Sequence, residues 1–246
     1  MKRTASWIKQ SLYRRDIFVT RGTPTHRLVR QCANLGVVDC LDIGANEGQF
    51  ASSILKVGWP GSVTSVEPLT SAYADLLGAA ASNPHWHVVQ RAVGERDGAV
   101  LINVSGNSVS SSVLPMAQAC LDAAPESAYV AQESVGMSSL DSLMDELGLE
   151  IGNTLIKVDV QGYEAQVFAG GEHVLSSTPA VLTEVSFVEL YAGQSLFPEI
   201  SRQLLRYGLE MWDLQPGLRD QNGRMLQADV MFVRSHRAGN SPSALV

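Results

Sequence analysis

Short apolar runs alternate with amphipathic stretches along most of this chain. Apolar runs of strand length lie at residues 37–43, 62–67, 87–93, 154–160 and 180–186. Stretches with helical spacing of apolar positions lie between or after them, at residues 47–57, 71–81, 140–147, 164–176 and 197–207. Strands and helices that alternate with short links predict a doubly wound α/β fold built on a mainly parallel sheet.

Two regions depart from this alternation. Residues 99–105 and 129–137 form a probable strand pair around a serine- and proline-rich stretch, and we interpret residues 99–137 as a lid-like insertion. Residues 209–214 and 228–234 are joined by a short turn, which predicts an antiparallel hairpin at one edge of a seven-stranded sheet. We therefore expect a basic helical cap over residues 1–34, one sheet domain over 35–236 and a flexible tail over 237–246.

Composition narrows the classes of function. The chain has 246 residues, of which 45% are hydrophobic, and this suits one α/β domain with additions. Its net charge of −7 argues against a nucleic-acid partner. The three cysteines lack metal-type spacing and suit reduced thiols, and no apolar run approaches the roughly 20 residues of a membrane-spanning helix. We expect a cytoplasmic protein.

The first thirty residues differ from the rest of the chain. They carry eight basic side chains against a single acid, Asp16, and among them are the apolar residues Trp7, Ile8, Leu12 and Phe18. Such a segment can pack on the sheet domain as a cap with its charges in water. It can also rest peripherally on an anionic membrane surface. The sequence leaves both interpretations open.

Residues 39–50, Asp-Cys-Leu-Asp-Ile-Gly-Ala-Asn-Glu-Gly-Gln-Phe, are the most informative stretch. Here the first strand enters a turn, in which Gly44 permits a sharp bend and Gly48 permits a ligand to approach the next helix. Carboxylates at Asp42 and Glu47 would repel a pyrophosphate, but they favour a ligand that carries ammonium and sulfonium groups. The turn, with Asn46, therefore favours S-adenosylmethionine over a dinucleotide.

The second strand ends in a further acid. Glu67 lies about twenty residues beyond Gly48, the spacing at which a carboxylate accepts hydrogen bonds from ribose hydroxyls. Pro68 fixes the chain just after it. We predict that Glu67 binds the ribose of the donor.

Acids also end later strands. Asp159 ends the strand over 154–160 and Glu184 lies on the strand expected beside it, so their carboxylates can come close together. Such a pair either shares a proton or holds a cation, and a divalent metal is possible but not predicted, since no histidine–acid cluster supports it. Lys157 points to the same side as Asp159 and can simply neutralise it. We predict that Asp159, Glu184 and Lys157 act at the acceptor.

Four aromatic residues follow the later strands. By default they belong to the core, but an aromatic group beside strand ends could also stack on a sugar ring or an apolar acceptor. These residues are Phe187, Tyr191, Phe197 and Trp212.

Several motifs occur in a defined order. They are Asp-Ile-Gly-Ala-Asn-Glu-Gly at 42–48, Val-Glu-Pro at 66–68, Ala-Val-Gly at 92–94, Leu-Asp-Ser-Leu at 140–143 and Ile-Lys-Val-Asp-Val-Gln-Gly-Tyr-Glu at 156–164. Over residues 39–234 the chain resembles the FkbM family of S-adenosylmethionine-dependent methyltransferases. The resemblance implies the class I methyltransferase fold, a Rossmann-like sheet. It also adds Ala45, Pro68, Ala92 and Asp159 to the expected donor-binding residues, which otherwise are Asp42, Gly44, Asn46, Gly48 and Glu67.

The segment from Glu184 to Phe187, with the Leu-Tyr-Ala-Gly-Gln run at 190–194, is similar to family members that O-methylate sugars. This implies a hydroxyl acceptor on a deoxysugar of a glycolipid or specialised metabolite, and S-adenosylmethionine as the donor. Two other classes stay open, a non-catalytic nucleotide-ligand-binding protein and a nicotinamide-dependent oxidoreductase on a related sheet. The oligomeric state is not fixed by the sequence.

Overall fold

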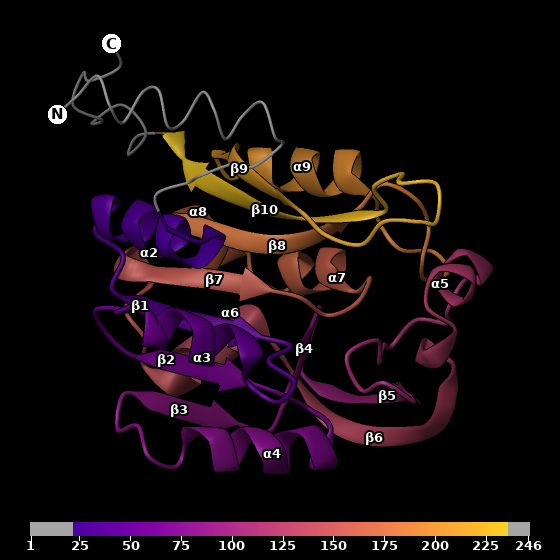
Figure 1. Ribbon diagram of the computed structural model, residues 1–246. Helices are drawn as coiled ribbons and strands as arrows, with labels where there is room; N and C mark the ends of the chain where they lie inside the picture. Colours follow the sequence, from indigo (N-terminus) through magenta and orange to yellow (C-terminus); the bar gives the residue numbers. More distant parts are fainter. Residues whose placement is uncertain (1–21, 236–246) are drawn as a thin grey trace, which may run out of the picture.

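The computed structural model describes residues 22–235, so the predictions for residues 1–21 and 236–246 lie outside the described residues. Its centre is a seven-stranded sheet in the order β3-β2-β1-β7-β8-β10-β9, flanked by helices (Figure 1). The parallel strands are β1 (Asp39–Ile43), β2 (Val63–Val66), β3 (Trp86–Val89), β7 (Thr154–Val158) and β8 (Ala180–Ser186). Strand β10 (Gln227–Arg234) pairs antiparallel with β8 and with the edge strand β9 (Leu209–Pro216). The predicted sheet and its edge hairpin are confirmed.

Helices pack on both faces of this sheet because successive strand residues point to opposite sides. One face packs against α2 (Pro24–Asn34), α3 (Gln49–Lys56) and α4 (Thr70–Ala80). The other face packs against α6 (Leu140–Leu147), α7 (Glu164–Ala169), α8 (Glu172–Ser177) and α9 (Phe197–Leu205). A short 3-10 turn, η2 (Ile151–Asn153), precedes β7. No helix within residues 22–235 has the length and apolar character needed to span a membrane.

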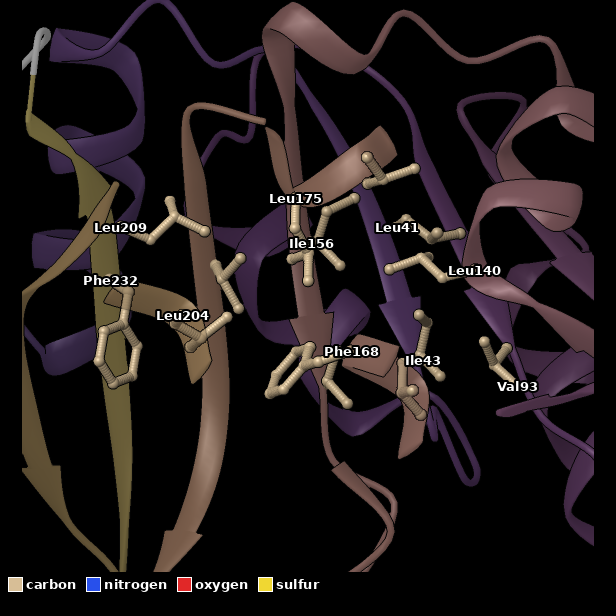
Figure 2. Packing of buried hydrophobic residues seen from close by; sticks show 14 of the residues in the cluster. Leu41, Ile43, Val93, Leu140, Ile156, Phe168, Leu175, Leu204, Leu209 and Phe232 are labelled. Carbon is tan, nitrogen blue, oxygen red and sulfur yellow. The ribbon is translucent and has the colours of Figure 1, made fainter. Parts of the chain in front are cut away.

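The larger core lies on the α6–α9 face of the sheet. Figure 2 shows Leu41, Ile43 and Ile156 of the strands beside Leu140 and Phe168 of the helices. Each of these side chains is almost fully buried, which contributes about 1.5–3 kcal/mol per side chain. The alternate strand positions face α2 and α3, and there the carboxyl-terminal halves of the strands carry polar residues. These residues are Asp42, Lys157, Glu184 and Asp229.

The prediction of one strand over residues 87–93 was wrong. The chain leaves the main sheet at Val89, and after a turn at Gln90 and Arg91 it enters β4 (Ala92–Gly94). Strand β4 joins a second sheet in the order β4-β6-β5, with β5 (Gly98–Ser105) and β6 (Tyr129–Ser139). Polar contacts hold the turn, because the Gln90 amide donates to the carbonyl of Pro68 at 3.3 Å. The predicted pairing of residues 99–105 with 129–137 is confirmed, with α5 (Gln118–Ala123) and η1 (Pro125–Ser127) between them.

The prediction of a single helix over residues 164–176 was also wrong, because the chain breaks at Gly170 and Gly171 into α7 and α8. A Cβ atom on Gly170 would lie 2.2 Å from the carbonyl oxygen of Gly94, and one on Gly171 would lie 2.6 Å from a Leu140 methyl carbon. Both glycines let β4 and α6 approach the break. These close approaches pack β4 of the second sheet against the helices that cover the main sheet.

Candidate functional site

Two cavities meet beyond the carboxyl ends of the strands. The large cavity, about 670 Å³, is lined by residues of β7, β8 and β10 and by α2 and α3. The small cavity, about 70 Å³, is lined by residues that follow β1, β2 and β7 and by β4. Five residues line both cavities: Gly44, Asn46, Val109, Asp159 and Gln161. The site therefore has two compartments that meet at the ends of β1 and β7.

Gly44 turns the chain out of β1, as the sequence predicts. Its φ of 75° lies in the left-handed region, and a Cβ atom at this position would lie 1.8 Å from the carbonyl oxygen of Asp159. The close neighbour is therefore the end of β7. Ala45 is buried and lines the large cavity beside Gly44.

Glu67 lines the small cavity, with Pro68 and Ala92. Its Oε2 accepts a hydrogen bond from the backbone N–H of Asn46 and its Oε1 accepts one from that of Leu69, both at 2.9 Å. Burial raises the pKa of Glu67, although the two N–H donors oppose this. Because each carboxylate oxygen has two lone pairs, one on each oxygen is left for ligand hydroxyls.

The structure places Asp42 and Gly48 away from both cavities. The carboxylate of Asp42 is fully buried, lies 3.0 Å from Lys157 Nζ and accepts a hydrogen bond from Ser65 Oγ at 3.2 Å. A Cβ atom on Gly48 would lie 2.6 Å from the Trp86 ring, whose Nε1 donates to Ser65 Oγ at 2.9 Å. Asp42 thus holds Lys157 and Gly48 makes room for Trp86, and neither residue is part of the lining of either cavity.

Lys157 connects the buried and the open part of the site. Its Nζ lies 3.0 Å from Asp42 and 3.5 Å from Asp159, and it donates to the carbonyl of Gly44 at 3.2 Å. Burial alone would lower the pKa of Lys157, but Asp42 and Asp159 raise it above its usual range. The predicted ion pair of Lys157 with Asp159 is present, and Asp42 is the nearer partner. Lys157 stays charged.

An amide lies between the carboxylates of Asp159 and Glu184. Gln161 Nε2 donates to Asp159 Oδ1 at 2.7 Å and to Glu184 Oε2 at 3.1 Å. Gln227 Nε2 donates to the same Glu184 oxygen at 2.6 Å. Within residues 22–235, the other oxygen of Glu184, Oε1, receives no hydrogen bond. The two carboxylates are therefore close, as predicted, but an amide separates them.

Burial and neighbouring acids make Glu184 a strong base for a carboxylate. Burial, followed by Asp159, Glu164 and Asp229, raises its pKa well above the usual range. Asp229 lies directly opposite Glu184 in the β8–β10 ladder and lines the large cavity, where it keeps some contact with solvent. Partial removal of its carboxyl group from water, followed by the charge of Asp159, raises the pKa of Asp229 to about 6. Glu164 accepts N–H bonds from Val160 and Gly162, each at 3.1 Å, and so shapes the turn that carries Gln161.

Sequence reasoning missed several residues of the site. Gln161 and Gln227 carry no charge and lie in no ligand-type spacing, and Asp229 follows from strand alternation only once the edge hairpin is in register with β8. Of the four aromatic residues, Tyr191 is buried with its hydroxyl bonded to Gln161, and Phe187 packs on Phe197 with ring centroids 5.5 Å apart. Among residues 22–235 no group of three or more His, Cys, Asp or Glu side chains is arranged to hold a metal ion.

Comparison with known proteins decides the family. The model of the methyltransferase FkbM domain matches residues 42–211, more than half of the chain. The chain belongs to the FkbM methyltransferase family. It is 30% identical over 160 residues to the 2-O-methyltransferase NoeI of Sinorhizobium fredii, a match that covers 63% of this chain and 65% of NoeI. The chain thus spans slightly less than two thirds of that relative's length.

Solved structures share the arrangement of strands and helices. One is a TehB-like SAM-dependent methyltransferase from Corynebacterium glutamicum, with a TM-score of 0.43, 13% identity and coverage of 95% of this chain and 97% of that one. Another is the magnesium protoporphyrin IX methyltransferase of Synechocystis PCC 6803, with a TM-score of 0.47, 12% identity and coverage of 86% and 78%. Membership of the FkbM family does not favour the oxidoreductase or the non-catalytic alternative.

Proposed function

We propose that this FkbM family protein is an S-adenosylmethionine-dependent O-methyltransferase whose acceptor is a hydroxyl-rich molecule of the sugar type. One observation carries the proposal. The small cavity, which holds the carboxylate of Glu67, meets the large cavity at Asp159 and Gln161. In the large cavity, Glu184 keeps one carboxylate oxygen free of hydrogen bonds. The name of the relative NoeI, a 2-O-methyltransferase, supports an oxygen acceptor.

The small cavity fits the adenosine part of the donor in its chemistry. Its walls combine apolar side chains with the carboxylate of Glu67, which suits an uncharged nucleoside with two ribose hydroxyls. Gly44, Asn46 and Asp159 then flank the methionine part where the cavities meet. Bound there, S-adenosylmethionine supplies a methyl group activated by positively charged sulfur.

The segment at 106–113 controls the size of the small cavity. At about 70 Å³ this cavity is much smaller than the ~300–1,000 Å³ of most small-molecule sites. Ser108 and Val109 line it, and the segment is held by bonds from Asn46 Nδ2 to Ser108 Oγ at 3.3 Å and from Ser112 Oγ to the Gln161 carbonyl at 2.6 Å. We propose that this part of the 99–137 insertion is a lid that moves outward to admit the donor.

The large cavity has the chemistry of a site for neutral polar acceptors. Its lining contains amides, which both donate and accept hydrogen bonds, and the carboxylates of Asp159, Glu184 and Asp229. Lys157, the cation of the described lining, is already held by Asp42 and Asp159. An anionic acceptor would therefore meet uncompensated negative charge. The amides are those of Asn46, Gln49, Asn107, Gln161, Gln215 and Gln227.

Glu184 is the residue placed to take the acceptor proton. A sugar hydroxyl is a far weaker acid than a carboxylic acid, so it cannot be fully deprotonated before the transfer. Glu184 Oε1 instead accepts the proton as the hydroxyl oxygen bonds to the methyl carbon, and its raised pKa favours this step. Asp159, held by Lys157 and Gln161, orients the groups around it.

Acceptor charge tests the proposed function. With S-adenosylmethionine and a panel of methyl glycosides, we expect release of S-adenosylhomocysteine with a neutral hexoside or an amino sugar. For the matched uronic acid we expect a kcat/KM lower by at least about tenfold, because like charges brought together cost several kcal/mol. Asp229→Asn should narrow this difference. Absence of S-adenosylhomocysteine with every acceptor of the panel would contradict the assignment.

Donor affinity tests the assignment of Glu67. Glu67→Gln keeps one acceptor oxygen but removes the charge, so we expect S-adenosylmethionine to bind more weakly by about 1.5–3 kcal/mol, the value of a hydrogen bond to a charged group. Isothermal titration calorimetry measures the change. Glu95→Gln, at an exposed position outside the lining of both cavities, is the matched control and should bind the donor normally. Equal affinity in both variants would exclude a ribose contact.

A further inference from the structure

Gln161 lies where the two cavities meet and has an unusual backbone. Its φ is 54°, in the left-handed region, although it is not a glycine. This conformation costs about 1–2 kcal/mol for a residue with a Cβ atom, so surrounding contacts must hold it. Ser112 Oγ, which donates to the Gln161 carbonyl at 2.6 Å, is one such contact. The chain thus keeps a side chain at a position that would suit glycine.

Tyr191 fixes which way the Gln161 amide faces. The Tyr191 hydroxyl donates to Gln161 Oε1 at 2.7 Å, and the ring of Tyr191 is buried. With its oxygen occupied by this donor, the amide turns its nitrogen toward the carboxylates. Both protons of Nε2 are then used, one for Asp159 and one for Glu184. Every polar atom of the side chain has a partner.

The bridge solves an electrostatic problem. Two carboxylates that approach the same amide nitrogen repel each other, which favours a shared proton or a bound cation unless other groups stabilise both charges. The Gln161 amide donates to both without adding charge, and Gln227 donates a second bond to Glu184 Oε2. All the donors to Glu184 within residues 22–235 act on Oε2, which leaves Oε1 for a ligand in the large cavity.

We propose that Gln161 is a positioning residue for methyl transfer, whose amide, oriented by Tyr191, bridges Asp159 and Glu184 and leaves one oxygen of Glu184 open to the acceptor hydroxyl. The inference rests on the proposed function and adds to it the means by which the base is kept ionised. Without the bridge, the two carboxylates share a proton. Glu184 then cannot accept one from the acceptor near neutral pH.

Replacing Gln161 leaves the chemical identity of the other ionisable groups around Glu184 unchanged. Asp159, Glu164 of α7 and Asp229 of β10 raise its pKa, and Lys157 of β7 lowers it. The neutral groups Cys120 of α5 and Tyr191 also face it. A change in the titration of Glu184 on removal of the amide therefore measures the bridge itself.

The first test is Gln161→Met, which keeps the length of the side chain and removes its donors. Carbon-13 NMR of the side-chain carboxyl groups follows the titration, with Glu184→Gln to assign the resonance. We expect Glu184 to titrate at higher pH than in the unchanged protein, and kcat at neutral pH to fall by about tenfold or more. Gln203→Met is the matched control, because that amide donates to the Ala165 carbonyl away from the cavities.

The second test is a double-mutant cycle with Tyr191→Phe, which keeps the buried ring and leaves Gln161 unchanged. Tyr191→Phe alone should shift the titration in the same direction by a smaller amount, and should have no further effect when Gln161→Met is present. An unchanged titration in Gln161→Met, or a Tyr191→Phe effect that persists in the double variant, would overturn the proposal. If the unchanged protein released no S-adenosylhomocysteine, the proposed function would be wrong. The titration of Glu184 would still show whether the Gln161 amide bridges the two carboxylates.

Discussion

Glu184→Gln should lower kcat by about 10²- to 10⁴-fold, the usual contribution of a general base, while donor affinity changes little. The amide is close to the carboxylate in size and keeps an oxygen, so the fold should survive. In the unchanged protein, kcat should fall as the pH is lowered, because Glu184 is active only when deprotonated. Its raised pKa places this fall above the usual carboxylate range. Initial rates at saturating donor and acceptor, across a pH series, measure both effects.

Two further variants separate the base from its neighbours. Asp159→Asn should lower kcat by less than Glu184→Gln, since both Asp159 oxygens are already held by Gln161 and Lys157. Glu210→Gln, on β9, is the matched control, because that carboxylate accepts a bond from Ser235 away from the site. If Asp159→Asn were the more damaging change, the proton would go to Asp159 and our assignment of Glu184 would be wrong.

Lys157→Met should destabilise the fold by about 3–5 kcal/mol, the usual cost of removing one partner from a buried ion pair. The change leaves the Asp42 carboxylate fully buried without its counter-ion. Urea unfolding at neutral pH, followed by far-ultraviolet circular dichroism, gives the free energy of unfolding. We expect the midpoint to move to lower urea with little change in the slope.

Asp42→Asn provides the control for this mechanism. In a chain that already carries Lys157→Met, it removes the uncompensated charge and should restore part of the lost stability. Lys56→Met, at an exposed position in α3, should change the free energy of unfolding by less than about 1 kcal/mol. If Asp42→Asn made the Lys157→Met protein still less stable, the buried Asp42 carboxylate without a counter-ion could not be the cause of the lost stability.

The sequence predicts the bounds of a helix or strand well where that element is decided by local pattern. Helix α6 and strand β8 have the predicted bounds, since a serine cap precedes the first and buried β-branched residues fill much of the second. The errors occur where distant parts of the chain decide. The break between β3 and β4 depends on pairing with β6, and the break between α7 and α8 depends on the backbone of β4.

The same distinction holds within the site. Glu67 and Asp159 were placed correctly at the cavities because strand ends in this fold share one edge. The ion pair of Asp42 with Lys157 was not predicted, because it depends on the β1–β7 register, which no local pattern reveals. Gln161 was missed because two of the partners of its amide, Glu184 and Tyr191, lie 23 and 30 residues further along the chain.

The hydrogen bond from Trp86 to Ser65 has a practical consequence. Ser65 in turn donates to Asp42, so the indole is linked through two bonds to the ion pair beneath the site. Indole emission responds to the charge and polarity around the ring, and Trp86 therefore acts as an optical probe that the protein already contains. With Trp7, Trp59 and Trp212 replaced by phenylalanine, Trp86 is the one tryptophan of the sequence that remains, and changes at the ion pair can be followed in real time without a dye or an isotope label.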